Sequence, residues 1–239
     1  MLLLSGKERL RWCFSKLRSS LIPDRCALCG SGEPYGTICN RCLAALPVAD
    51  AACRRCAVPL AAAQAAATDC GPCQAKPPVF TRAFSAVNYA FPIDAALKAF
   101  KFHGRLYYAP AFASLLLPLL NSGFIDADAL VPVPLHRWRH ARRGFNQATE
   151  ICRILAGQSG IPMYRPVSRI RPTRSQSGLT AAARHSNLKN AFMVCETLRC
   201  RHPVIIDDVM TTGETCNQIA RVLIGAGAES VGVLVIARA

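Results

Sequence analysis

Four C-x-x-C pairs follow one another in the first third of this 239-residue chain. They are Cys26/Cys29, Cys39/Cys42, Cys53/Cys56 and Cys70/Cys73. A C-x-x-C turn directs two thiolates toward one point, and two such turns supply the four ligands of a tetrahedral structural zinc site. The sequence therefore predicts a small zinc-binding module, with one zinc on the first four cysteines and a second on the last four.

Two other uses of these cysteines remain open, namely disulfides and a redox dithiol. A reducing cytosol disfavours structural disulfides, and a redox site needs only one pair, so both are weaker than zinc. The pairs could also interleave between the two metals. Because four thiolates close the coordination shell, the metal is expected to hold structure and not to catalyse.

The sequence divides into three parts. We expect a basic amphipathic segment over residues 1–22, a cysteine-rich module over 23–78 and a second domain over 79–239, with the boundary after Pro77-Pro78. The amino terminus lacks the layout of a secretory signal, which predicts a cytoplasmic protein. Helical spacing of apolar residues there leaves two readings, packing on its own domain or peripheral contact with a membrane: Leu10, Phe14, Leu17 and Leu21.

The uncharged stretch from Leu106 to Ile125 is nominally long enough to cross a bilayer. Pro110 and Pro118 argue against a membrane span. The segment is instead predicted to be a helix that covers a sheet and is broken near these prolines.

Basic residues exceed acidic ones by 29 to 14, which gives a formal charge of +15. Between Ala129 and Cys195 there are eleven Lys or Arg and one acid, Glu150. This imbalance is typical of an anion-binding surface, although a solvated basic face would show it too.

Apolar runs alternate with helical stretches from Val79 onward. The strand-like runs "ALVPVPL", "VIIDDV" and "SVGVLVIARA" are separated by the helical "GFNQATEICRILAG" and "ETCNQIARVLIGAG". Strand, helix and strand in that order predict an α/β domain with a parallel sheet covered by helices. Ligands of such sheets bind at the carboxyl ends of the strands.

The stretch "VIIDDVMTTGET" places two carboxylates and a threonine-rich turn at such an end. Val204 to Val209 fits a buried strand and Glu214 to Gly225 fits the following helix. Threonine hydroxyls, a close-approaching glycine and the first helical N–H groups can bind a phosphate: Thr211, Thr212, Gly213, Glu214 and Thr215. Asp207 and Asp208 would repel phosphate, but they can accept from sugar hydroxyls or act through Mg²⁺. A ribose 5-phosphate offers both groups.

The same stretch resembles the PRPP-binding motif of type I phosphoribosyltransferases. Together with "VPVPLHRWRHARRGFNQ", "RPTRSQSGLTAAARHSNLKNAF" and the cysteine-rich start, it is similar to the ComF family of competence-associated proteins. The resemblance begins at about Cys26. It implies a type I phosphoribosyltransferase-like parallel sheet flanked by helices and preceded by the zinc module. It also implies binding of PRPP with Mg²⁺, and handling of single-stranded DNA in natural transformation, beside a DNA-translocating helicase at the inner face of the membrane.

The resemblance also implies roles for two polar segments. The family's pyrophosphate loop corresponds to the segment with Arg137, Arg139, Arg142, Arg143, Asn146 and Gln147. Arginine forks suit pyrophosphate and a nucleic-acid backbone equally well. A flexible loop that closes over PRPP corresponds to the segment with Arg171, Arg174, Gln176, Ser177 and Arg184.

Enzymatic turnover is a separate question. Purine-salvage relatives carry an aspartate base where this chain has Thr211, and no acid lies between Asp208 and Glu214. No catalytic residue is assigned; His103 and His136 could accept a proton. Two alternatives to DNA handling therefore stay open, a transferase with an unidentified nitrogen acceptor, and a zinc-organised module for protein interaction or metabolite sensing. Three aromatics could stack on bases, but core packing is the more ordinary role: Trp138, Phe145 and Phe192.

Overall fold

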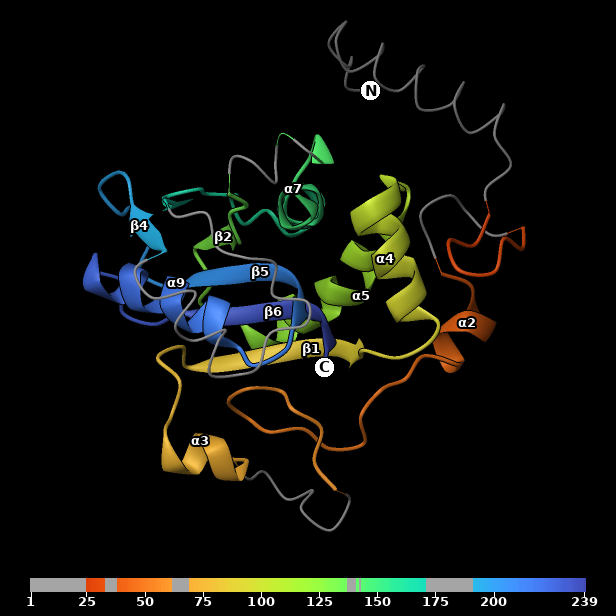
Figure 1. Ribbon diagram of the computed structural model, residues 1–239, viewed down its shortest axis with the longest axis horizontal. Helices are drawn as coiled ribbons and strands as arrows, with labels where there is room; N and C mark the ends of the chain where they lie inside the picture. The colour runs from red at the N-terminus through yellow and green to blue at the C-terminus, as the bar shows by residue number, and fades with distance from the viewer. Residues whose placement is uncertain (1–24, 33–37, 62–68, 137–140, 142, 171–190) are drawn as a thin grey trace, which may run out of the picture. The chain divides into compact units, whose positions relative to one another are not determined.

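The computed structural model describes residues 25–32, 38–61, 69–136, 141, 143–170 and 191–239 (Figure 1). The chain divides between Ala45 and Leu46 into two compact units. The first unit contains the first two C-x-x-C pairs and a short helix, α2 (Asn40–Ala44). The cysteine-rich segment predicted over 23–78 therefore spans both units, and its second half belongs to the same unit as the sheet.

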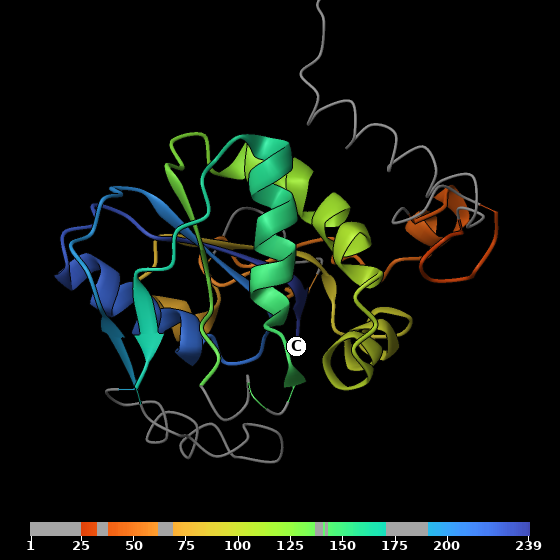
Figure 2. The ribbon, with the colours of Figure 1, turned by 90° about the horizontal axis from the view of Figure 1, so that it is seen from above.

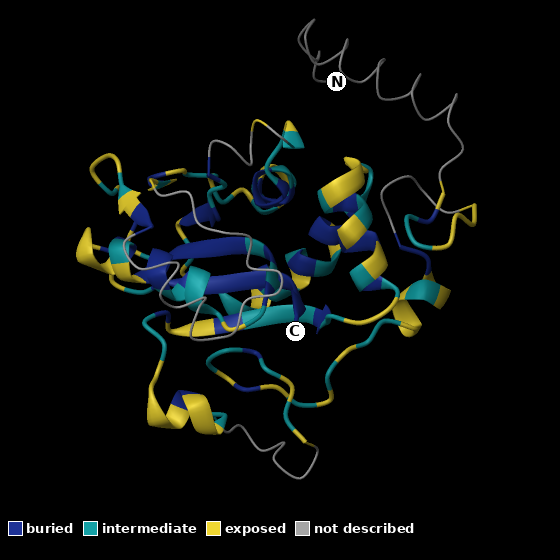
Figure 3. Cartoon of the chain, viewed as in Figure 1, coloured by how far each residue is buried: buried dark blue, intermediate teal, exposed yellow. Residues whose placement is uncertain are grey.

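A parallel sheet forms the centre of the larger unit. The strands lie in the order β1-β6-β5-β2, and each neighbouring pair is parallel. Their bounds are β1 (Arg82–Asn88), β6 (Gly232–Arg238), β5 (Pro203–Met210) and β2 (Ala129–Pro132). β6 is buried along its whole length (Figure 3), as its near-continuous apolar sequence requires in a sheet covered on both faces.

Helices cover the sheet, which confirms the predicted α/β class. The helices that contact it are α5 (Tyr108–Gly123), α7 (Gln147–Ser159) and α9 (Glu214–Gly225). The same unit also contains α3 (Gly71–Ala75) and α4 (Ile93–His103), and α4 packs against α5. α5 and α7 pack side by side (Figure 2), α5 against β1 and β6, and α7 against β2 and β5. α9 packs on β5 through a cluster that also holds strand residues Val131, Ile205, Val233 and Val235.

Because side chains alternate along a strand, this packing assigns the two faces of β5. Ile205 joins the cluster under α9, and Asp207 shares its parity. Ile206 and Asp208 belong to the other set of side chains. The paired acids at the end of β5 are therefore directed to opposite faces of the sheet.

Two short strands form a separate antiparallel ribbon, β3 (Val167–Arg169) with β4 (Phe192–Val194). β4 packs against α9. The predicted flexible loop, with Arg171, Arg174, Gln176, Ser177 and Arg184, joins these strands and lies outside the described residues, as does the amino-terminal segment 1–22.

The predicted break in the helix over 106–125 is wrong. α5 runs without interruption from Tyr108 to Gly123 and contains Pro118 in its interior. Pro110 lies in the first turn, where a missing N–H costs little. The helix persists past Pro118 because it buries Phe112, Leu116 and Leu120 completely against the rest of the domain. Within the described residues, none of the helices combines the length and apolar character needed to span a bilayer.

Pro118 should nevertheless lower the free energy of unfolding of the protein. Its side chain is exposed, and a proline at this position cannot donate to the Ser114 carbonyl one turn earlier. Replacing Pro118 with alanine is expected to raise the free energy of unfolding by about 1–3 kcal/mol, measured by urea denaturation. Pro110→Ala is the control, and it should leave stability unchanged or lower it by up to about 1 kcal/mol. Equal responses of the two variants would contradict this account of the helix.

Candidate ligand-binding cleft and cysteine tetrads

A polar cleft of about 220 Å³ lies at the carboxyl ends of β2 and β5. It is lined by the segments that the sequence singled out after each of these strands. The predicted residues that line it are Arg143, Asn146, Gln147, Asp207, Asp208, Thr211, Thr212, Gly213, Glu214 and Thr215. Three other predicted residues, Arg137, Arg139 and Arg142, lie outside the described part of the chain.

The two acids at the end of β5 have different surroundings. Asp208 is 7% exposed, and its carboxylate forms an ion pair of 2.9 Å with the ammonium group of Lys101 from α4. The Asp207 carboxylate accepts a hydrogen bond of 2.9 Å from the backbone N–H of Asp208. One acid is thus neutralised by a lysine, while the other is held by the strand's own backbone.

This arrangement separates the acids electrostatically. Burial, and then the neighbouring charge of Asp208, raise the pKa of Asp207 to about 7, against the attraction of Lys101. Burial on its own would lower the pKa of Lys101, but attraction to Asp208 outweighs it and the pKa is raised. The ligand-free cleft therefore holds a carboxyl group that exchanges its proton near neutral pH.

The turn after β5 has the geometry expected of a phosphate-binding loop. Gly213 precedes the first residue of α9 and has φ of 76°, in the left-handed region that glycine adopts without strain. The Thr212 hydroxyl accepts a hydrogen bond of 3.4 Å from the N–H of Glu214. The Glu214 carboxylate accepts from the Gln218 side chain at 2.6 Å, one turn further along α9.

The segment after β2 is held by its own polar residues. The Asn146 side chain accepts from the N–H of Ala148, which caps α7, and donates to the carbonyl of Val133 at 2.9 Å. The buried Gln147 accepts from Arg143 and donates to the carbonyl of Lys101, each at 3.4 Å. Both amides therefore position the loop and its cation, and their predicted contact with a ligand stays a prediction.

Sequence reasoning missed three residues of this cleft, Lys101, Phe102 and Arg169. Lys101 follows Leu97 by four positions on the buried face of α4, and a cation on an apolar stripe is a signal that could have identified it. Phe102 is 61% exposed and its ring lies 5.2 Å from the Arg143 guanidinium. Arg169 is the last residue of β3, and no local sequence pattern indicates that this strand contributes to the cleft.

The aromatic residues considered for base stacking and the histidines considered as proton acceptors differ in burial and contacts. Phe145 contacts Phe100 with ring centroids 5.8 Å apart, and Phe192 is buried in the cluster under α9. Phe192 thus belongs to the core, as the more ordinary interpretation predicted, whereas Phe145 is only partly buried and lines a second hollow. His136 is 6% exposed, and His103 is the last residue of α4. Trp138 lies outside the described residues.

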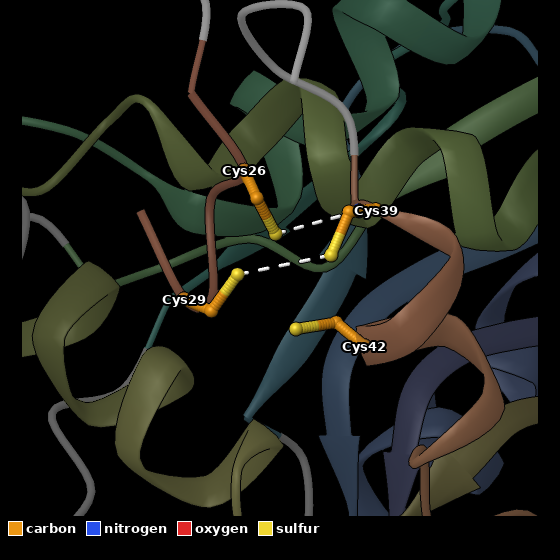
Figure 4. Close-up of side chains that lie close together, drawn as sticks. All are labelled: Cys26, Cys29, Cys39 and Cys42. Carbon is orange, nitrogen blue, oxygen red and sulfur yellow. Dashed lines mark hydrogen bonds between the residues drawn. The ribbon is translucent and has the colours of Figure 1, made fainter. Parts of the chain in front are cut away.

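The first four predicted metal ligands converge (Figure 4). The sulfur atoms of Cys26, Cys29, Cys39 and Cys42 all lie within 4.8 Å of one another. Cys29 and Cys39 have sulfurs 3.7 Å apart. Four sulfurs around zinc, each bonded at about 2.3 Å, would be about 3.8 Å apart, so the tetrad fits a tetrahedral metal.

The second four converge in the same way, within 4.8 Å: Cys53, Cys56, Cys70 and Cys73. The sequential pairing excludes the interleaved alternative. In both tetrads the third cysteine donates its backbone N–H to the sulfur of the first, at 3.4 Å from Cys39 and 3.2 Å from Cys70. The two sites therefore repeat one local structure.

Before a metal binds, local hydrogen bonds lower the pKa of some thiols of the tetrads, whereas burial raises the pKa of Cys42, Cys56 and Cys73. A hydrogen bond with the Ser31 hydroxyl lowers the pKa of Cys29 to about 6. Burial raises the pKa of Cys53, but the amides of Cys70 and Cys56 outweigh it and lower the pKa to about 7. Two all-sulfur, four-ligand sites are typical of structural zinc, and they leave no coordination position for a substrate.

Family models agree with both parts of this description. One described as a double zinc ribbon domain matches residues 17–74, and one described as a phosphoribosyl transferase domain matches residues 141–239. Fold, cleft and tetrads thus define a phosphoribosyltransferase-type domain joined to a double zinc ribbon.

Named relatives place the chain more narrowly. It is 39% identical to the DNA utilization protein YhgH of Salmonella typhi over 175 residues, which cover 71% of this chain and 77% of that protein. It is 32% identical to competence protein F of Haemophilus influenzae over 71% of this chain and 78% of that protein. Competence protein ComFC of Bacillus subtilis is 28% identical over 60% and 58% of the two chains. The chain belongs to the ComF family.

Proposed function

We propose that this protein binds PRPP with Mg²⁺ in the cleft at the end of β5 and handles single-stranded DNA in a ligand-dependent way. The observation that carries the PRPP part is the arrangement at one strand end. Asp207 and Asp208 lie beside a glycine turn that begins α9, within one cleft. Hydroxyl acceptors next to a helix start match a sugar that carries a 5-phosphate.

Each part of PRPP has a candidate partner. The 5-phosphate would accept from the threonine hydroxyls and the first amides of α9, and the ribose hydroxyls would donate to the acids. Lys101, Arg143 and Arg169 line the same cleft and would attract the pyrophosphate group. The carboxylates of Asp207 and Asp208 would hold Mg²⁺, because oxygen ligands suit this ion, and the bound ion would supply positive charge to offset the phosphates.

The DNA part of the proposal is supported by charge and by the names of the relatives. A second hollow of about 400 Å³ shares Pro134, Leu135 and Asn146 with the first, and Arg153 and Arg165 line it. A phosphate backbone could follow these arginines. The relatives are named for competence and DNA utilization, which favours a partner such as a DNA-translocating helicase at the inner face of the membrane.

Transfer of the phosphoribosyl group to a nitrogen acceptor is the second candidate. Asp207 favours it, because a carboxyl group with a pKa of about 7 can take up a proton at neutral pH. Titration of PRPP and Mg²⁺ by calorimetry, with and without a short single-stranded oligonucleotide, separates the two when pyrophosphate release is assayed. Binding that changes DNA affinity without turnover supports DNA handling. Release that depends on an added base supports a transferase, and absence of PRPP binding sinks both.

Asp207→Asn provides a variant in which binding and stability should change in opposite directions. Because folding raises the pKa of Asp207 from about 4 to about 7, the folded protein loses stability as the pH rises through this window. Asparagine removes the loss and can still accept from the Asp208 amide. The ligand-free variant should gain about 1–2 kcal/mol at pH 8 in urea denaturation.

The same variant should bind PRPP at least about tenfold more weakly, since a carboxylate is lost from the ribose site. Asp126→Asn is the matched control, because Asp126 lines a hollow at the other end of the sheet. Weaker binding without any loss of stability cannot arise from misfolding. Unchanged PRPP affinity in Asp207→Asn would remove the ribose assignment.

A further inference from the structure

The guanidinium group of Arg238 links the second tetrad to the phosphate turn. Arg238 ends β6 and is 8% exposed. Its Nε donates to the carbonyl of Cys56 at 3.0 Å, and its Nη1 donates to the backbone oxygens of Met210 at 3.0 Å, Thr211 and Ala239. One side chain thus holds backbone oxygens that are far apart in the sequence.

On the side of the cleft, these bonds fix the direction of two peptide groups. A peptide unit is planar and its N–H points opposite to its carbonyl. Because Arg238 binds the carbonyls of Met210 and Thr211, the N–H groups of Thr211 and Thr212 are turned away from the guanidinium. Both threonines line the cleft. Arg238 therefore orients the backbone donors of the turn.

On the side of the tetrad, the contacted carbonyl belongs to a metal-ligand residue. Ala57 follows Cys56 with φ of 54°, and its N–H donates to the carbonyl of Cys53 at 2.9 Å. Gly30 holds the equivalent place in the first tetrad, with φ of 74° and the same bond to Cys26. We call the turn from Cys53 to Ala57 the Cys56 knuckle. An alanine in the left-handed region is strained, so the knuckle keeps its conformation only if the residues packed around it hold Ala57 in place.

Those surroundings are shared with the turn. Ala57 is buried in the same cluster as Met210 and Cys216, and Cys56 packs on its edge. The contacts run from the knuckle, through Arg238, to the carbonyls of the turn. A change in the knuckle's geometry would alter the position of the guanidinium, because Arg238 binds both ends.

We propose that Arg238 is a positioning residue that couples metal loading of the second tetrad to anion binding at the turn from Met210 to Gly213. The inference rests on the proposed function in assigning the 5-phosphate of PRPP to this turn. Coupling between two binding sites is reciprocal. Bound PRPP should slow the release of zinc from the second tetrad, and loaded zinc should strengthen PRPP binding.

The test measures zinc release to a chromogenic chelator from the full chain carrying Cys26→Ser and Cys29→Ser, so that the metal comes from the second tetrad. Arg238→Met should release zinc about tenfold faster without ligand, and bind PRPP about tenfold more weakly, because hydrogen bonds from a charged donor are lost. PRPP should slow release from the parent protein and have no effect on release from Arg238→Met.

Two control variants separate coupling from a general loss of stability. Arg82→Met removes an exposed arginine on β1 that donates to the Gly123 carbonyl at 3.4 Å, and it should change neither property. Leu116→Ala opens a cavity under α5, away from both sites, and should lower the melting temperature without changing zinc release below it. Arg238→Lys keeps the charge and should recover only part of the coupling, since an ammonium group lacks the planar fork.

The outcomes distinguish this inference from the proposed function. If PRPP binds the parent protein but Arg238→Met releases zinc at the parent rate, or PRPP slows release equally in both, the coupling is overturned. If PRPP does not bind while inorganic phosphate still slows zinc release through Arg238, the proposed function fails alone. If neither anion binds, the turn is not an anion site and both fall.

Discussion

Replacing Asp208 with asparagine should lower the free energy of unfolding by about 2–3 kcal/mol, because it leaves the ammonium group of Lys101 without its carboxylate in a buried site. The two side chains are 2.9 Å apart, and 24% of the Lys101 side chain and 10% of the Asp208 side chain are exposed. Little solvent is available to replace the lost partner. Urea denaturation at pH 7 of the ligand-free protein measures the change.

A second substitution tests the cause. Lys101→Met in the Asp208→Asn background removes the uncompensated charge and should restore much of the lost stability, because an apolar side chain fits this buried position. The double-mutant cycle gives the interaction between the two residues. If the double variant were less stable than Asp208→Asn, the charge of Lys101 would not be the source of the loss.

The same helix supplies a matched control. Asp94 and Lys98 form an ion pair of 2.8 Å within α4, and 57% of the Lys98 side chain is exposed. Water screens such a pair, so Asp94→Asn should change stability far less than Asp208→Asn. Similar losses in the two variants would mean that burial does not set the energy of the Asp208 pair.

Local sequence patterns predicted the part of the cleft that follows one strand. The strand over 204–209 and the helix over 214–225 were predicted from a buried apolar run, a glycine turn and helical spacing, and β5 and α9 confirm both. The information lies within about twenty residues. The signal for the tetrads is equally local, since each C-x-x-C pair fixes half of a site.

Long-range contacts escaped the same reasoning. Lys101 reaches Asp208 across more than a hundred positions, and Arg238 reaches Cys56 across a still longer interval. Neither contact corresponds to a periodic pattern in the sequence, because the sheet order β1-β6-β5-β2 brings these distant segments together. The prediction for α5 failed for a related reason. The helix-breaking propensity of Pro118 is a local property, and tertiary burial of the helix face overrides it.

The two tetrads, identical in donor set, should differ sharply in what their loss does to the fold. The second tetrad belongs to the unit that contains the sheet, and its knuckle residue Ala57 is buried in the cluster under α9. Cys53→Ser with Cys56→Ser should lower the main thermal unfolding midpoint by about 10 °C, which corresponds to a loss of at least about 3 kcal/mol in a domain of this size.

The first tetrad provides the comparison, since Cys26 and Cys29 lie in the smaller unit. Cys26→Ser with Cys29→Ser should remove the zinc of that tetrad and leave the main transition in place, because neither cysteine belongs to the described hydrophobic cluster under α9. Calorimetry with zinc analysis of each variant measures both effects. Equal shifts for the two variants would show that the ribbons stabilise one cooperative structure. A midpoint unchanged by the Cys53 and Cys56 substitutions would show that the sheet folds without this metal. Metal loading would then have no effect for Arg238 to couple to the phosphate turn.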